Sequence, residues 1–161
     1  MYMSRMASIG AAGLAIVFSS PALAQSQKNP APAAARSAVE KTHRVVIQVT
    51  QNDPAVMNMA LNNAENLVKY YNDKGEKIEI EFVAYGNGLS MVRSDISPVK
   101  DRLTALSSLK NVTFSGCGNT MAGQSKQENK SISLVPEARI VPSGIARIVE
   151  LSESGWTYVR P

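Results

Sequence analysis

The sequence predicts an α/β fold with a mainly parallel sheet covered by helices on both faces. Short runs rich in β-branched residues alternate with helical segments five times along the chain. The first of these runs, Arg44–Thr50, is apolar almost throughout, which is typical of a strand buried on both faces. Small polar and glycine-rich loops follow successive strands, and in such a sheet that edge is where ligands bind.

The N-terminal region is expected to be an export signal followed by a linker. Arg5 is the only charge before the apolar stretch at residues 7–20, and small residues precede Ala24. This pattern predicts a signal peptide at 1–24, cleaved after Ala24, and a periplasmic or secreted protein. The alternative is a membrane anchor, but the stretch is shorter than the roughly 20 residues that a spanning helix needs. A flexible linker is expected at 25–41 and one α/β domain at 42–161, with no membrane association after cleavage.

The first half of the domain predicts a strand, a helix and a second strand. Arg44–Thr50 has four β-branched apolar residues in seven. Asp53 can cap a helix whose first residue is Pro54, and Gly75 can end it with a positive φ. Apolar residues recur between them at helical spacing: Val56, Met59, Ala60, Ala64, Leu67, Val68 and Tyr71. Lys77–Tyr85 alternates and then becomes apolar, which predicts a strand that is deeper in its second half.

The second half continues the alternation with shorter elements. A short helix at Leu89–Val92 precedes Ser97-Pro98, which resembles a helix cap. The elements expected after it are a helix at Val99–Leu109, a strand at Asn111–Ser115, a helix at Asn119–Lys130 and a strand at Ala138–Val141. A further helix is expected to be capped by Ser143 and ended by Gly155, with Ile145, Ile148, Val149 and Leu151 inside. The last expected strand is Trp156–Val159.

Composition argues against several classes of function. The formal net charge of +4 comes from scattered residues without aromatic interleaving, so nucleic-acid binding is not expected. One histidine and one cysteine cannot build a zinc site within a monomer, and no metal is expected. His43 could serve as a base for Cys117, but its place before the first strand favours a solvated position at the opposite edge of the sheet. Gly86-Asn87-Gly88 lacks the third glycine of a dinucleotide fingerprint, and no cofactor is expected.

Three loops are predicted to meet at the carboxyl ends of the strands. The first is Gln51-Asn52-Asp53, and the others supply the candidate ligand-binding residues: Gly86, Asn87 and Gly88 after the second strand, and Gly116, Gly118, Asn119 and Thr120 after the third. Asn87 and Asn119 can donate or accept hydrogen bonds from a ligand, or can simply satisfy turns.

Cys117 is the candidate catalytic residue. Glycines on both sides leave space beside the sulfur, and Asn119 or Thr120 is expected to cap the helix that follows. Oriented N–H groups at a helix N-terminus favour a thiolate and lower the pKa below the free value of about 8.5. The alternative is a small apolar residue at the end of a buried strand, and spacing alone leaves both interpretations open.

The chain resembles the DsrE/DsrF-like sulfur-relay family. The resemblance lies in the motif Phe114–Met121 (F-x-G-C-G-N-T-M), the loop Tyr85–Leu89 and the sequence of the predicted helical segment Ala60–Leu67. It extends over Thr42–Arg160. It implies a three-layer α/β/α sandwich with a five-stranded, mainly parallel sheet, assembly into a homotrimer or homohexamer, and sulfur carried as a persulfide on Cys117.

The expected function is therefore that of an exported sulfur carrier, sulfurtransferase-like, acting through Cys117. Its partners would be a small sulfur compound or the thiol of a partner protein. Two alternatives remain open: a module that binds a small ligand without catalysis, and an oligomeric scaffold, the cysteine being non-catalytic in both.

Overall fold

The structure is a computed structural model that describes residues 41–161. The predicted signal peptide and nearly all of the predicted linker lie outside the described residues, so both stay predictions. The strands are β1 (Thr42–Val49), β2 (Lys77–Ala84), β3 (Val112–Cys117), β4 (Ala138–Val141) and β5 (Thr157–Val159). The helices are α1 (Pro54–Asp73), the 3₁₀ helix η1 (Gly86–Val92), α2 (Lys100–Ser107), α3 (Gly118–Glu128) and α4 (Gly144–Glu153).

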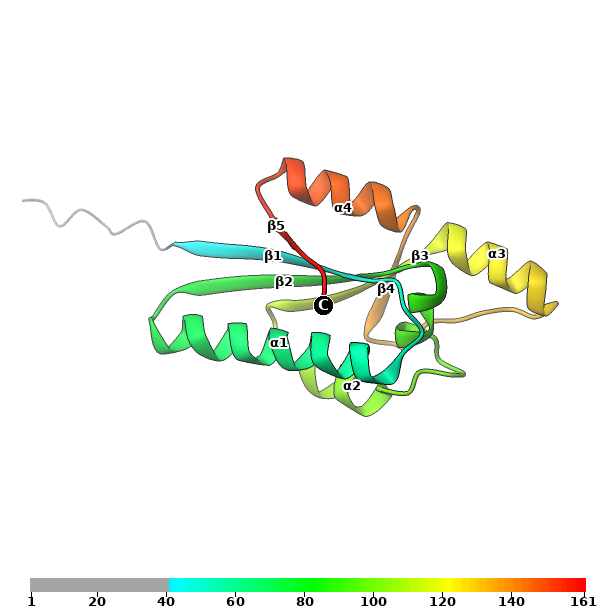
Figure 1. The fold of residues 1–161 in the computed structure, drawn as a ribbon, viewed down its shortest axis with the longest axis horizontal. Helices are drawn as coiled ribbons and strands as arrows, with labels where there is room; N and C mark the ends of the chain where they lie inside the picture. The colour runs from blue at the N-terminus through cyan, green and yellow to red at the C-terminus, as the bar shows by residue number, and fades with distance from the viewer. Residues whose placement is uncertain (1–40) are drawn as a thin grey trace, which may run out of the picture. The chain divides into compact units, whose positions relative to one another are not determined.

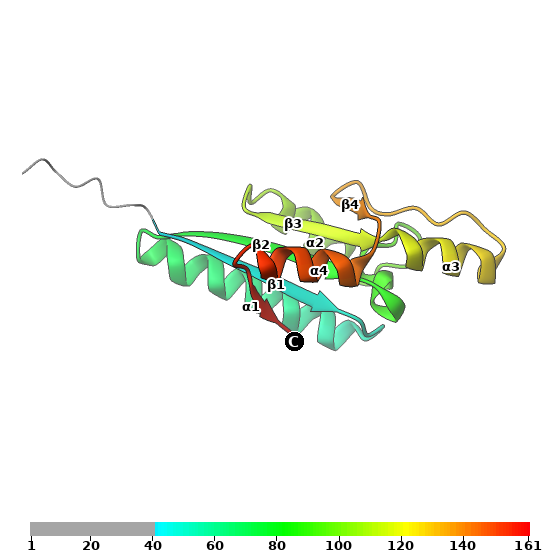
Figure 2. The same ribbon diagram turned by 90° about the horizontal axis from the view of Figure 1, so that it is seen from above.

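The five strands form one parallel sheet in the order β4-β3-β2-β1-β5. Helices α1 and α2 lie against one face and α4 against the other, whereas α3 extends beyond the carboxyl ends of the strands (Figure 1). Figure 2 shows the strands side by side, with β5 and β4 at opposite edges. The predicted fold class, a three-layer α/β/α sandwich with a five-stranded parallel sheet, is confirmed.

The two faces of the sheet are covered unequally. The face under α1 and α2 holds the main core, where Phe82 and Phe114 stack with ring centroids 5.0 Å apart. The face under α4 holds a small apolar cluster of Val46, Val83, Ile148 and Leu151. Because one helix covers that face, polar side chains fill the part of it that α4 leaves open.

Most of the predicted helix boundaries are confirmed. The Asp53 carboxylate accepts a hydrogen bond from the Ala55 N–H at 2.8 Å and caps α1, and Ser143 caps α4. Gly75 follows α1 with a φ of +68°, and Gly155 follows α4 with a φ of +88°.

Helices α2 and α4 differ in detail from the prediction. Ser97 is not a helix cap, because α2 begins later, at Lys100, and the Ser97 hydroxyl donates to the Met91 carbonyl instead. Ile145 and Val149 were expected inside, but they are 56% and 48% exposed, because only the side of α4 that carries Ile148 and Leu151 faces the sheet.

Gly88 brings η1 close to the end of β1. A Cβ atom at this position would lie 2.3 Å from the carbonyl oxygen of Val49, so no larger residue fits without movement of the backbone. This close approach fixes the loop after β2 against the loop after β1.

Among the described residues, no helix combines the length and the apolar character that crossing a bilayer would demand.

Candidate functional site around Cys117

The loops after β1 and β2 meet the start of α3, which directly follows β3, at the edge of the sheet where the prediction placed them. The Gly86 N–H donates to the Thr120 hydroxyl at 3.1 Å, and the Gln124 side chain donates to the Gly86 carbonyl at 3.1 Å. The Ser90 hydroxyl of η1 donates to the Asn52 side chain at 2.7 Å. These bonds connect η1 with α3 on one side and with the end of β1 on the other.

Cys117 is the last residue of β3 and is itself the N-cap of α3. Its backbone is extended, and its sulfur accepts a hydrogen bond from the Thr120 N–H at 3.4 Å. The prediction that Asn119 or Thr120 would cap this helix is wrong. Strand β3 runs into α3 without an intervening loop, so the final strand residue occupies the capping position.

A second helix N-terminus also reaches the sulfur. The backbone N–H of Gly144, the first residue of α4, lies beside the sulfur and helps to lower the pKa of the Cys117 thiol. Burial alone raises the pKa of the Cys117 thiol. The Thr120 hydroxyl and the backbone N–H groups of Gly144, Thr120 and Asn119 outweigh that effect, and the pKa is lowered from its ordinary value. The site therefore stabilises the thiolate more than the surroundings of a free cysteine do.

The sulfur is nearly enclosed. Cys117 is 5% exposed, and Val141 is its neighbour on β4. The ring of Tyr85 packs so closely on Gly144 that a Cβ atom at Gly144 would lie 2.9 Å from the Tyr85 Cβ. The Tyr85 hydroxyl accepts a hydrogen bond from Gln48, which in turn accepts one from the Tyr158 hydroxyl. The Tyr85 ring thus lies against Gly144, the residue whose backbone N–H is beside the sulfur.

The other predicted ligand-binding residues fall into two groups. Gly86, Asn87 and Thr120 line a cavity of about 230 Å³ together with residues of α3. The others serve packing or the backbone of the α3 N-terminus: Gly88, Gly116, Gly118 and Asn119. A Cβ atom at Gly116 would lie 2.6 Å from the Leu134 side chain, and one at Gly118 would lie 3.3 Å from the Ile140 side chain. The Asn119 N–H donates to the Pro142 carbonyl at 3.2 Å, which joins α3 to the turn before α4.

His43 lies at the opposite edge of the sheet. Its Nε2 atom is 2.6 Å from the Glu76 carboxylate, and its ring stacks on Tyr71 with centroids 3.8 Å apart. A position at the amino end of β1 excludes His43 as a base for Cys117. Within residues 41–161, no three His, Cys, Asp or Glu side chains are grouped as metal ligands would be.

Sequence reasoning missed a buried ionic cluster on the α4 face. Glu81 is 2% exposed, and its carboxylate accepts hydrogen bonds from Ser115, Arg139 and Arg147 at 2.7–3.0 Å. The alternation in β2 gave the only signal, because it places Glu81 on the same face as Val83. Nothing local indicated that two later arginines would cover this carboxylate.

A second buried cation was also missed, and it stabilises the base of α3. Arg93 is 2% exposed and binds the side chains of Asp95, Gln124 and Glu128. Hydrogen bonds from Arg93 and Lys130 lower the pKa of Glu128 to about 2. These contacts connect the segment after η1 with the last turn of α3, far from the sulfur, and we assign them a structural role.

The comparisons with known proteins support the fold and give no activity. No family model matches the chain, and a search of curated proteins finds no match. Among solved structures, the chain is similar to MTH1491, a protein of unknown function from Methanobacterium thermoautotrophicum. The identity is 28%, the TM-score is 0.64, and the match covers 74% of this chain and 99% of that one.

Proposed function

We propose that this chain is an exported, DsrE-like sulfur carrier that takes up a sulfur atom on Cys117. One observation carries the proposal: the N-termini of α3 and α4 converge on the single thiol of the chain and favour its ionised form. A thiolate is the species that attacks sulfane sulfur, and the residues around Cys117 hold negative charge on that atom. Export rests on the signal peptide expected at residues 1–24.

The proposed chemistry consists of two successive sulfur transfers. The Cys117 thiolate attacks the outer sulfur of a donor, and the donor's leaving group departs with the electron pair of the broken bond. The resulting persulfide transfers its outer sulfur to the thiol of a partner protein by the same kind of exchange. Thr120 and Gly144 hold the charge at the sulfur, and no cofactor enters the sequence of steps.

Mass spectrometry tests this proposal. The protein is incubated with thiosulfate or polysulfide, and a covalent adduct with the mass of one sulfur atom is expected on Cys117. Cys117→Ser is the matched control, because serine keeps a capping oxygen at the start of α3 and cannot form a persulfide. Wild-type protein that carries no adduct with either donor would remove the proposal.

The low exposure of Cys117 favours a second candidate function. With 5% of its surface accessible, the cysteine could serve as a cap within a module that binds a small ligand at the loop edge. Ligand-induced thermal stabilisation separates the two functions. A Cys117→Ala variant that keeps the full stabilisation would favour the binding module, and a variant that loses it would favour chemistry at the sulfur.

We also propose self-association as a homotrimer or homohexamer. Ile140, Ile145 and Val149 are exposed apolar side chains on β4 and α4, and burial between copies would stabilise an assembly. Light scattering of the mature protein measures the mass directly. A strictly monomeric protein at micromolar concentration would contradict this part of the proposal.

A further inference from the structure

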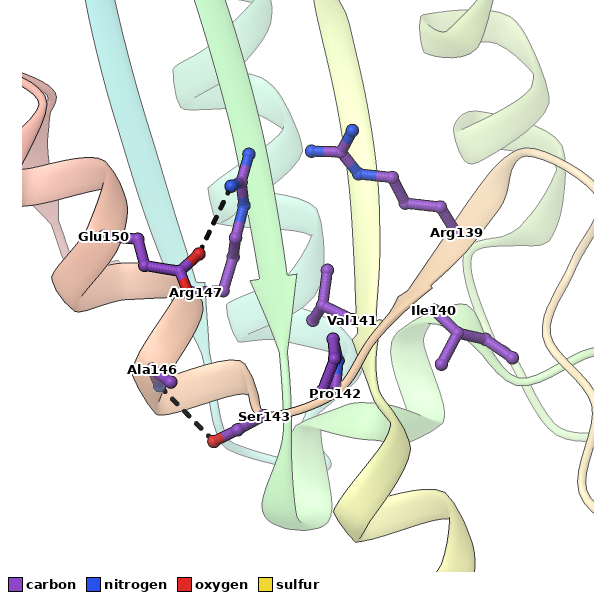
Figure 3. Close-up of a pocket in the computed structure, with 8 residues that line it drawn as sticks. All are labelled: Arg139, Ile140, Val141, Pro142, Ser143, Ala146, Arg147 and Glu150. Atoms are coloured by element: carbon purple, nitrogen blue, oxygen red, sulfur yellow. Dashed lines mark hydrogen bonds and ion pairs between the residues drawn. The ribbon is translucent and has the colours of Figure 1, made fainter.

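We propose that the cavity between β4 and α4 is an oxyanion subsite that holds the sulfonate end of thiosulfate next to Cys117. This inference rests on the proposed function, since it names the donor class that the thiolate would use. The cavity has a volume of about 330 Å³. Figure 3 shows its walls, in which Arg139 comes from β4, Arg147 and Glu150 from α4, and Ser143 from the turn between them.

Both arginines are held in place by the buried Glu81. Arg139 donates through Nη2 to Glu81 at 2.7 Å and through Nε to Ser115 at 3.1 Å. Arg147 donates through Nε and Nη2 to Glu81 at 3.0 Å and 2.8 Å. The two guanidinium groups therefore lie over the same part of the sheet, as Figure 3 shows, with fixed orientations before any ligand arrives.

The cluster carries surplus positive charge. Two arginines share one buried carboxylate, which leaves one positive charge uncompensated at the cavity wall. Glu150 is the next carboxylate, but its side chain is 66% exposed and its oxygen lies 3.5 Å from Arg147 Nη1, so solvent screens most of its effect. A pair of partly exposed arginines with this surplus charge, beside an open cavity, favours an anion.

The cavity adjoins the sulfur through two of its own residues. Val141 lines the cavity and is the partner of Cys117 across β3 and β4, strands that lie about 4.8 Å apart. Ser143 also lines the cavity, and the next residue, Gly144, has its backbone N–H beside the sulfur. An anion on Arg139 and Arg147 would thus be held on the α4 face, one strand away from the thiolate.

The hydrogen-bond chemistry selects an oxyanion among sulfur donors. Guanidinium groups bind oxygens of sulfonate-like groups in bidentate fashion, whereas polysulfide offers no oxygen. In thiosulfate the sulfonate would lie on the arginines with the outer sulfur directed to Cys117. The thiolate forms an S–S bond with that sulfur, the bond between the two thiosulfate sulfurs breaks, and sulfite leaves with the electron pair. The charge is conserved and no oxidant or reductant is needed.

Calorimetric titration of thiosulfate into Cys117→Ser protein measures binding without transfer. The further variant Arg139→Gln removes one guanidinium that is 51% exposed, so the fold should tolerate the change. Loss of a charge-assisted hydrogen bond should weaken binding at least about tenfold. Arg139→Lys keeps the positive charge but lacks the paired N–H donors of a guanidinium group, so this variant should bind thiosulfate with intermediate affinity. Arg44→Gln is the matched control, because Arg44 pairs with Glu79 at the far end of β1 and should have no effect.

The outcomes separate this inference from the carrier function. If thiosulfate does not bind, or if the Arg139 and Arg44 variants bind equally, the subsite is wrong, even when Cys117 still takes up sulfur from polysulfide. If thiosulfate binding depends on Arg139 but no donor transfers sulfur to wild-type Cys117, the result contradicts the carrier function and supports the subsite. Arg139→Gln should slow loading from thiosulfate and leave loading from polysulfide unchanged; equal slowing would overturn the inference.

Discussion

Neutralising Glu81 should destabilise the fold by about 3 kcal/mol at pH 7. The Glu81→Gln change keeps the shape of the side chain but removes the charge that Arg139 and Arg147 share. Breaking a buried ion pair from one side costs about 3–5 kcal/mol, and the lower end applies because both arginines retain some contact with solvent. Guanidinium-induced unfolding of the wild-type and variant proteins measures the difference.

The same perturbation has a defined dependence on pH. Burial raises the pKa of Glu81, but the hydrogen bonds from Arg147, Ser115 and Arg139 outweigh it, and the pKa is lowered from 4.5. A lowered folded-state pKa means that the carboxylate contributes its full stability above the unfolded value. That contribution disappears as the pH falls through the folded pKa. The difference between wild type and Glu81→Gln should therefore be constant from pH 7 to about 5 and shrink in more acidic solution.

Glu79→Gln is the matched control for this experiment. Glu79 lies two residues earlier on the same face of β2 and pairs with Arg44, but its side chain is 47% exposed. An exposed pair of this kind contributes at most about 1 kcal/mol. Equal losses of stability in the Glu79 and Glu81 variants, or a loss at Glu81 that does not change with pH, would refute the assignment of a buried anionic anchor.

Two further predictions concern the thiol and the loop packing. Thr120→Val removes the hydroxyl that helps to lower the pKa of the Cys117 thiol, so the pH midpoint of Cys117 alkylation should rise. Thr157→Val on β5 should leave the midpoint unchanged. An unmoved midpoint in the Thr120 variant would contradict the role of that hydroxyl. Gly88→Ala places a Cβ atom 2.3 Å from a carbonyl oxygen of β1, so the free energy of unfolding, measured by chemical denaturation, should fall by at least about 2 kcal/mol. Gly123→Ala lies in open space on α3, so the free energy of unfolding should rise by up to about 1 kcal/mol. Similar stabilities for the two glycine variants would show that η1 moves away from β1 without strain.

Local chemistry was enough to predict most of the architecture. Asp53-Pro54 and Ser143 mark helix starts with side chains that bond to the nearest N–H groups, and Gly75 marks an end with its positive φ. Each of these signals acts within a few residues, so no knowledge of the tertiary structure is required. The parallel sheet then follows from the alternation of strands and helices.

The parts that could not be predicted depend on residues far apart in sequence. Arg139 and Arg147 lie 58 and 66 positions after Glu81, and only the pairing of β2, β3 and β4 brings them together. The N–H of Gly144 reaches Cys117 because β4 pairs with β3 in a register that no local pattern defines. The pattern after Phe114 also could not show that β3 continues directly into α3.

The capping role of Cys117 has a consequence for any covalent change at its sulfur. The atom that accepts the Thr120 N–H also closes the opening turn of α3, so alkylation, oxidation or sulfur uptake replaces the acceptor on which that turn depends. Helix α3 is joined to Gly86 by Thr120 and Gln124, so a modification of one atom would be transmitted to η1 across the end of the sheet. The rates of amide hydrogen exchange along α3 would then report whether the cysteine has been modified.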